Sequence, residues 1–312
     1  MIRTWQNIIA AVTALLVSTT LWAKVKVVVT IPDLAYAVEQ IGGDLVEVTP
    51  LLRGVENPHH VDAIPDFIRL VADADVVCLV GLDLEVGYMP LVLARSGNAR
   101  VQPQGEGYCE VGLGVEPIQK PTSPVDRSMG DIHPAGNPHY YMSPALLAKG
   151  AIEIFKVLSR VDRQHSSIYA DRLKLFQLTM NQLTIDIGAL LQPLKQVQST
   201  NDKCAIIIEY HEEFAYFLQQ YGLRSFGTLE EKPGVPPSAG RLAITALAAK
   251  ACKVRVLLSA EYYSKKILDR FSELSGAEAI IAPAMTQPSG KIRSYPELQY
   301  FIANQLLSAI RK

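Results

Sequence analysis

From residue 24 onward, short runs of β-branched and other apolar residues alternate with stretches whose apolar positions recur at helical spacing. In the first half, the runs predict strands at 25–30, 46–51 and 75–80, with a weaker candidate at 99–101. Residues 34–41 and 64–72, which lie between these runs, have the spacing of amphipathic helices. Strands that alternate with helices in this way predict a parallel sheet covered on both faces.

The middle of the chain departs from this alternation. A polar stretch from 102 to 137, which contains three prolines in its second half, is predicted to wrap the surface. A helix is then expected from Ser143-Pro144 to about residue 158. Residues 165–192 contain one glycine and no proline, so they predict a second helix that would span roughly 42 Å.

The second half of the chain repeats the alternation. The predicted strands are 204–210, 224–228, 254–259 and 279–282, and the predicted helices are 213–221, 240–251, 265–275 and 296–310. A length of 312 residues also favours two domains. We therefore predict an α/β fold of two lobes, each a mostly parallel sheet flanked by helices, joined by one long rigid helix. The predicted boundaries are a first lobe at 24–163, a connecting helix at 164–195 and a second lobe at 196–312.

The first 23 residues differ in character from the rest. Arg3 supplies a positive charge, residues 8–21 form an apolar segment, and Ala23 is a small residue at a plausible cleavage point. The apolar segment is shorter than a comfortable membrane span. It predicts a cleaved signal peptide at 1–23 and export to the periplasm, with an uncleaved anchor as the alternative. No cysteine lies near this segment, so the lipid attachment of a lipoprotein is not expected.

Export would allow disulfides to persist. Cys204 begins one predicted strand, and Cys252 shortly precedes another. If these runs are neighbouring parallel strands, the two cysteines lie at the same edge of the sheet and can bridge, and four free thiols are the alternative. Cys78 lies inside an apolar run and is expected to be a buried small hydrophobe, whereas Cys109 has no obvious partner.

The charge of the chain is nearly balanced, with 30 Lys and Arg against 31 Asp and Glu, so nucleic acid is not an expected partner. The six histidines are more informative, because four lie in three short segments at junctions between strands and loops. His59 and His139 each follow Asn-Pro, and His211 ends a predicted strand. Ligands bind at the carboxyl ends of parallel strands, and neutral imidazole is the commonest metal ligand. These three histidines therefore predict a metal site assembled by the tertiary fold, and the alternative for each is a solvated loop residue.

The other three histidines are weaker candidates. His60 would point away from whatever His59 faces if the chain is extended there. His133 is interpreted either as a group behind the ligands or as a loop residue. His165 stands at the start of the long helix and is expected to be exposed to solvent.

Several motifs together resemble those of the zinc and manganese solute-binding proteins of bacterial ABC transporters, a periplasmic metal-binding protein family. They are Pro58-His59, the run Ala-Asp-Ala-Asp at 72–75, Gly-Leu-Asp-Leu-Glu at 81–85, the segment 130–139, Tyr210-His211 and the loop 231–238. The resemblance covers nearly all of the chain after residue 24. It implies two α/β lobes with the ion held between them by His59, His139 and His211. The partners that it implies are the metal ion and a membrane permease, and we expect a monomer that is not an enzyme.

The fourth ligand is where this chain departs from the family pattern. Many members use an Asp just before a Tyr in the last loop, but the corresponding loop at 290–295 has no Asp. The carboxylate chosen here is Glu261, which lies just past a predicted strand, and the alternatives are Glu297 or a water molecule. The His- and Asp-rich loop of many zinc members is also absent, so a second, low-affinity metal site is not expected.

Three imidazoles favour Zn²⁺ over Mn²⁺, which prefers more carboxylate oxygen, although ligand type does not exclude Cu²⁺ or Ni²⁺. Zinc is therefore the expected ligand, carried for transport, and manganese is the second choice. A rival interpretation is a zinc hydrolase, because three histidines and an open position also hold catalytic zinc. A hydrolase needs a general base, for which Glu209, Glu212 and Glu213 are the candidates. Acidic residues beside a helix start more often serve the helix dipole, so we favour capture over catalysis.

Overall fold

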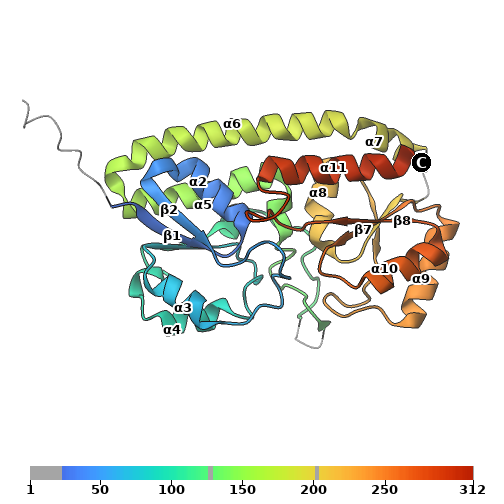
Figure 1. Ribbon diagram of the computed structural model, residues 1–312, viewed down its shortest axis with the longest axis horizontal. Coiled ribbons are helices and arrows are strands. Elements are labelled where there is room, and N and C mark those ends of the chain that lie inside the picture. The colour runs from blue at the N-terminus through green and yellow to red at the C-terminus, as the bar shows by residue number, and fades with distance from the viewer. Residues whose placement is uncertain (1–22, 126–128, 201–203, 312) are drawn as a thin grey trace, which may run out of the picture.

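The computed structural model describes residues 23–125, 129–200 and 204–311 of the chain. Its strands form two separate four-stranded sheets, and the strand pairs within them are parallel (Figure 1). The strand orders are β2-β1-β3-β4 and β6-β5-β7-β8, so the two sheets have the same topology. In each sheet the chain first moves to one side of the opening strand and then to the other. Such a switch point leaves a crevice at the carboxyl ends of the strands.

The strands largely follow the predicted runs. The first sheet contains β1 Val25–Val29, β2 Val46–Pro50, β3 Val76–Leu79 and β4 Tyr108–Glu110. The second contains β5 Ile207–Glu209, β6 Ser225–Thr228, β7 Val256–Ala260 and β8 Glu278–Ala282. The strand predicted at 99–101 is wrong, because Ala99–Val101 is a 3₁₀ helix whose first turn is capped by the side chain of Asn98. The fourth strand instead lies inside the stretch 102–137 that was predicted to wrap the surface.

Helices cover both sheets. The first lobe, built on β1–β4, contains α2 Pro32–Gly42, α3 Pro65–Ala72, α4 Met89–Ser96 and α5 Pro144–Val161. The second lobe, built on β5–β8, contains α8 Ala215–Gln220, α9 Ala239–Ala251 and α10 Lys265–Ser275. Helix α4 was not predicted. Among the residues that the structure describes, no helix has the length and apolar character needed to cross a membrane.

The connection between the lobes is made by α6 Ser166–Leu190 and α7 Gln192–Ser199. The predicted helix at 165–192 ends slightly early, because Pro193 lies in the first turn of α7 and cannot continue the preceding helix. Figure 1 shows α6 running along one side of the molecule past both lobes, with the final helix α11 Tyr295–Arg311 beside it. Helix α11 also reaches the first lobe, where the Tyr295 hydroxyl donates to the Tyr141 carbonyl at 2.6 Å.

Direct hydrogen bonds join the two lobes as well. The backbone N–H of Thr286 donates to the buried carboxylate of Asp33 at 3.1 Å. The amide of Gln299 donates to the carbonyl of Met142 at 3.1 Å, and the backbone N–H of Asp131 donates to the carbonyl of Pro233 at 2.8 Å. The lobes are therefore held together at several points along their interface and not by the connecting helices alone.

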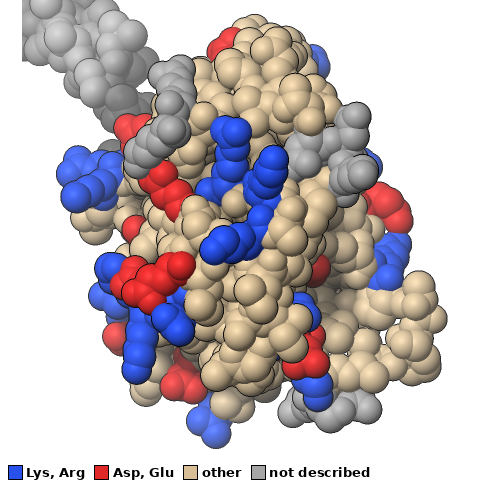
Figure 2. Space-filling view, turned by 90° about the vertical axis from the view of Figure 1, so that its right-hand side faces the viewer, with Lys and Arg blue, Asp and Glu red and all other residues tan. Residues whose placement is uncertain are grey.

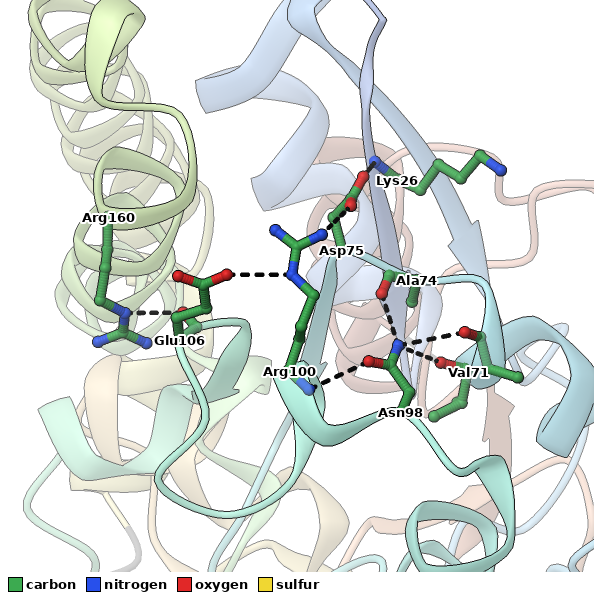
Figure 3. Close-up of polar contacts among 9 residues, drawn as sticks. Lys26, Val71, Ala74, Asp75, Asn98, Arg100, Glu106 and Arg160 are labelled. Atoms are coloured by element: carbon green, nitrogen blue, oxygen red, sulfur yellow. Dashed lines mark hydrogen bonds and ion pairs between the residues drawn. The ribbon is translucent and has the colours of Figure 1, made fainter.

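Polar side chains fix the edge of the first sheet where β1 and β3 begin (Figure 3). The Asn98 amide donates to carbonyl oxygens at the end of α3 and just before β3, among them Ala74 at 2.7 Å. The Arg100 guanidinium pairs with Asp75 at 2.8 Å and with Glu106 at 3.0 Å, while Asp75 accepts from the backbone N–H of Lys26. These contacts provide hydrogen-bond partners for polar groups at the amino-terminal edge of the sheet. They do not involve the opposite edge, where the strands end.

The predicted disulfide is confirmed. Cys204 and Cys252 are bonded, with their Cα atoms 5.5 Å apart, and they precede the neighbouring strands β5 and β7. Cys78 is a buried free cysteine, as expected. Cys109 is also buried and lies opposite Cys78 in the register of β3 and β4, so its neighbour in the fold is a second thiol.

The end of the second lobe, which faces the viewer in Figure 2, carries basic and acidic side chains together. A group of Lys and Arg lies near the centre of this face, with acidic side chains to one side of it. This face therefore carries side chains of both signs, as the nearly balanced composition of the chain would suggest.

Candidate metal centre

Three histidines from distant parts of the chain meet between the two lobes. His59 lies in the loop that follows β2, His139 begins the 3₁₀ helix His139–Met142, and His211 comes two residues after β5. Each offers one ring nitrogen, and these three atoms all lie within 4.8 Å of one another. The Nε2 atoms of His59 and His139 are only 3.1 Å apart. The structure thus brings together the three histidines that the sequence predicted as a site.

The two Asn-Pro-His segments share one local structure. The side-chain carbonyl of Asn57 accepts from the backbone N–H of His59 at 3.0 Å, and that of Asn137 accepts from His139 at 2.8 Å. Such turns, closed by an asparagine side chain, hold the backbone ahead of the histidine. The amide of Asn137 also donates to the Glu212 carbonyl at 2.9 Å, which links the first lobe to the segment carrying His211. The asparagine side chain therefore restricts the backbone in addition to the proline, whose ring fixes φ.

Two of the imidazoles are oriented by hydrogen bonds at Nδ1. The Nδ1 of His139 lies 2.9 Å from the Tyr141 hydroxyl, and the Nδ1 of His211 lies 2.8 Å from a carboxylate oxygen of buried Glu230. The same oxygen of Glu230 accepts from the backbone N–H of Gly234 at 2.9 Å. With Nδ1 engaged in each case, Nε2 is the nitrogen left for an ion, as is usual behind metal-binding histidines. Sequence reasoning missed Tyr141 and Glu230.

The three imidazoles differ in charge. Burial and the neighbouring histidines hold the pKa of His59 and of His139 well below the ordinary value, so both rings are neutral. Burial also acts to lower the pKa of His211, but the carboxylates of Glu213 and Glu230 outweigh it and raise that pKa to about 9. His211 is therefore protonated at neutral pH, while the other two rings have free lone pairs.

The cavity beside the cluster is small. Its volume is about 50 Å³, which is room for an ion with one or two waters and too little for a sugar or an amino acid. The lining includes His139 and His211 from the cluster, together with His133, Asn137 and Glu212. The size and the polar lining together favour an ion as the bound species.

The structure does not bring the predicted fourth ligand to this cluster. Glu261 is exposed, and its carboxylate accepts from the Gln287 amide at 2.5 Å. The alternative, Glu297, accepts from the backbone N–H groups of Arg293 and Ser294 at 2.8 and 3.1 Å, at the start of α11. Within the described chain, the group of potential ligand atoms comprises the three histidines and neither carboxylate.

The remaining histidines occupy different surroundings. The Nε2 of His60 lies 3.3 Å from a carboxylate oxygen of Asp131, and the His60 side chain is exposed. The expectation that His165 is solvent-exposed is wrong, because its side chain is only 20% exposed and its Nδ1 lies 2.7 Å from the Asp162 carboxylate. His133 lies against the cluster, with its ring centroid 5.0 Å from that of His59.

The glutamates considered as a general base differ in position, because two of them are buried and one lines the small cavity. Glu209 is buried at the end of β5, and Glu213 is buried and accepts from the Tyr262 hydroxyl at 3.0 Å. Glu212 contributes its backbone carbonyl to the bond with Asn137. None of the three belongs to the histidine cluster among the described residues, although Glu212 lines the small cavity beside it.

The chain is similar in sequence to proteins that are named for zinc uptake or manganese binding. The sequence profile of the family described as "ZnuA: Zinc-uptake complex component A periplasmic" matches residues 27–309. The manganese-binding lipoprotein MntA of Bacillus subtilis (strain 168) is 27% identical over 209 residues, which are 65% of this chain and 60% of the relative. The high-affinity zinc uptake system protein ZnuA of Brucella suis is 23% identical over 175 residues, which are 56% of this chain and 50% of the relative. The chain thus spans between half and three fifths of the length of these relatives.

Solved structures with the same fold include a ZnuA crystal structure, with a TM-score of 0.76 and 23% identity, covering 92% of this chain and 99% of that one. Another is the protein FpvC from Pseudomonas aeruginosa in complex with Mn²⁺, with a TM-score of 0.70 and 20% identity, covering 93% of this chain and 98% of that one. At these identities the likeness establishes the two-lobed fold.

Proposed function

Because the chain belongs to this family of periplasmic zinc-uptake components, we propose that it captures a divalent transition-metal ion between its lobes for an ABC transporter. The observation that carries the proposal is the convergence of His59, His139 and His211, whose ring nitrogens lie within 4.8 Å of one another. A small polar cavity beside them suits an ion better than any larger solute. The partner that receives the ion is a membrane permease, and the chain acts as an exported, periplasmic monomer. The predicted signal peptide lies almost wholly in residues 1–22, outside the described residues.

We propose zinc as the ion and manganese as the second choice. Three imidazole nitrogens suit Zn²⁺, which accepts four ligands in a tetrahedron at about 2.0–2.1 Å from nitrogen. Tetrahedral geometry at that length places ligand nitrogens about 3.4 Å apart, close to the 3.1 Å between the Nε2 atoms of His59 and His139. Mn²⁺ prefers more oxygen ligands, and the cluster offers no carboxylate among the described residues. Relatives of both kinds support the wider proposal, since one is named for manganese and another for zinc.

Capture in this site combines two neutral ligands with one protonated ligand. His59 and His139 offer their lone pairs directly, whereas His211 must release the proton that it shares with Glu230. The carboxylate then faces the outer nitrogen of a metal-bound imidazole and balances part of the charge of the ion. Release requires withdrawal of at least one ligand, and His211 is the ligand supplied by the second lobe.

The test is the metal content of the purified protein, measured by elemental analysis for the wild type and for His59→Ala, His139→Ala and His211→Ala. We expect about one zinc per chain in the wild type and its loss, or a large fall in affinity, in each variant. His165→Ala is the matched control, because His165 bonds to Asp162 and does not belong to the cluster. A wild-type protein that takes up neither Zn²⁺ nor Mn²⁺ on titration would overturn the proposal.

A further inference from the structure

A fourth histidine borders the cluster. The ring centroid of His133 lies 5.0 Å from that of His59, equal to the distance between the His59 and His139 rings and shorter than the 5.4 Å between His59 and His211. His133 also lines the same small cavity as His139 and His211. It belongs to the same segment as His139 and lies six residues before it in the chain.

The hydrogen bonding of the two ring nitrogens of His133 is unusual for a residue with only a structural role. Its Nε2 is buried and has no hydrogen-bond partner within the described residues. A buried polar atom left without a partner is unfavourable and needs an explanation, such as an ion that it would bind. The His133 ring donates a hydrogen bond to the backbone carbonyl of Asp83, and because Nε2 is unpartnered, the donor is Nδ1. His133 thus repeats the arrangement of His139 and His211, with one nitrogen anchored and the other left for an ion.

The backbone that anchors His133 is itself held in a demanding conformation. Gly81, Leu82 and Asp83 have positive φ values of 81°, 53° and 65° in succession. For Leu82 and Asp83 this conformation is unfavourable, and such backbone strain tends to persist at functional sites. The buried carboxylate of Glu85 stabilises the turn by accepting from the backbone N–H groups of Val80 and Gly81 at 2.7 and 3.1 Å.

The segment that carries His133 is tied to both sides of the site. The backbone N–H of Asp131 bonds to the Pro233 carbonyl in the second lobe at 2.8 Å. The carboxylate of Asp131 lies 3.3 Å from the imidazole of His60. The carbonyl of His133 accepts from the N–H of Gly136 at 3.0 Å, which closes a turn directly before the Asn137 turn. His133 therefore lies on a short loop that is anchored on both sides. Its ring needs only a small movement to reach an ion bound by the other three histidines.

We propose that His133 supplies the fourth ligand, which makes the centre a set of four imidazoles with no carboxylate. The inference rests on the proposed function and deepens it. His133 falls outside the trio whose nitrogens all lie within 4.8 Å, so its ring moves inward when the ion binds. A tetrahedral set of nitrogen ligands further favours Zn²⁺, Co²⁺ or Cu²⁺ over Mn²⁺. It also supplies a fourth ligand in a chain whose last loop at 290–295 has no Asp.

The test combines ligand counting with affinity. X-ray absorption at the zinc edge counts the imidazoles around the ion, and competition with a chromophoric chelator gives the affinity for Zn²⁺. We expect four imidazoles in the wild type and three in His133→Ala, with affinity lower by at least tenfold. His133→Gln serves as a second variant that keeps a polar side chain in the loop, and His165→Ala is the matched control, with four imidazoles and unchanged affinity. Co²⁺ provides an independent probe, because its visible absorption bands should shift in His133→Ala.

The outcomes separate this inference from the function on which it rests. Three imidazoles in the wild type, with affinity unchanged within twofold in both His133 variants, would overturn the fourth ligand and leave the metal centre intact. A wild-type chain that binds no metal would overturn both. Loss of one imidazole in His133→Ala, with the His165 control unchanged, would support the fourth ligand directly.

Discussion

The pH dependence of zinc capture is the sharpest consequence of the charges in the cluster. Burial keeps His59 and His139 neutral, whereas Glu213 and Glu230 overcome the effect of burial and raise the pKa of His211 to about 9. Below pH 9, each bound Zn²⁺ must therefore displace one proton from His211. The affinity should fall about tenfold for each unit of pH, or about 100-fold from pH 8 to pH 6. That change corresponds to about 2.7 kcal/mol, at about 1.36 kcal/mol per unit.

Two measurements check this expectation. Competition with a chelator at pH 6, 7 and 8 gives the slope of the affinity, and calorimetry in buffers of different ionisation enthalpy counts the protons released. The expected count at pH 7 is close to one. A slope of two or three would mean that His59 or His139 is also protonated, and a slope of zero would mean that His211 is neutral. Either result would refute the charge assignment.

A pair of glutamate variants tests the cause. Glu230→Gln removes the carboxylate that bonds to His211, so fewer protons should be released at pH 7 to 8. At pH 9, where proton competition is weak, the loss of the orienting carboxylate should lower affinity by about 10- to 100-fold. Glu231→Gln makes the same chemical change at the exposed neighbouring position and should leave both the slope and the affinity unchanged.

Two further predictions concern stability. Burial raises the pKa of Asp33 from 3.8 to about 7, so the stabilisation from its protonated form is complete below about pH 4 and is lost as the pH rises through 7. In urea unfolding, the stability of the wild type relative to Asp33→Asn should therefore fall by about 2–3 kcal/mol between pH 5 and pH 7, and a difference independent of pH would contradict this. Replacing Cys204 and Cys252 together by Ala removes a crosslink across 48 residues and should lower the free energy of unfolding by about 4 kcal/mol. Equal stability of the variant and the oxidised wild type would argue against the disulfide, and the reduced wild type is the control.

The fold was predictable because most strands are β-branched runs bounded by helices of clear periodicity. The failures have local causes. At 99–101 the apolar pattern was overridden by the cap from Asn98, which turns the chain into a 3₁₀ helix. The strand Tyr108–Glu110 is only three residues long and shows too little alternation to stand out from the polar stretch around it. The break between α6 and α7 follows from Pro193, which the sequence placed at the end of one helix but not at the start of another.

Family and function class were also accessible from the sequence. The profile match over residues 27–309 confirms the resemblance to metal-binding solute receptors, and with it the prediction that the chain is not an enzyme. The choice of zinc stays a proposal, since relatives named for zinc and for manganese both match.

The three clustered histidines were predictable from the sequence, whereas the side chains that hydrogen-bond to their rings were not. Three histidines after strands stood out because histidine is rare in this chain and the carboxyl ends of strands converge. The roles of Tyr141 and Glu230 depend on which side chains pack behind each ring, and no local pattern encodes that packing. Glu261 was chosen for its place after a strand, yet its carboxylate accepts from Gln287 at 2.5 Å, and it stays a prediction without geometric support. His133 shows the reverse, because its role becomes visible only once its unpartnered nitrogen is seen.

The hydrogen bonds that cross between the lobes bear on how long an ion stays bound. Asn137, Asp131, Asp33, Tyr295 and Gln299 all take part in such bonds, and Tyr216 adds another to the Asn137 carbonyl at 2.6 Å. At about 0.5–1.5 kcal/mol each, six of them oppose separation of the lobes by about 5 kcal/mol. Only about one molecule in several thousand would then be open at any moment. In isolation the protein would therefore retain a bound ion for a long time. Rapid release of the ion would need a partner that binds the open form.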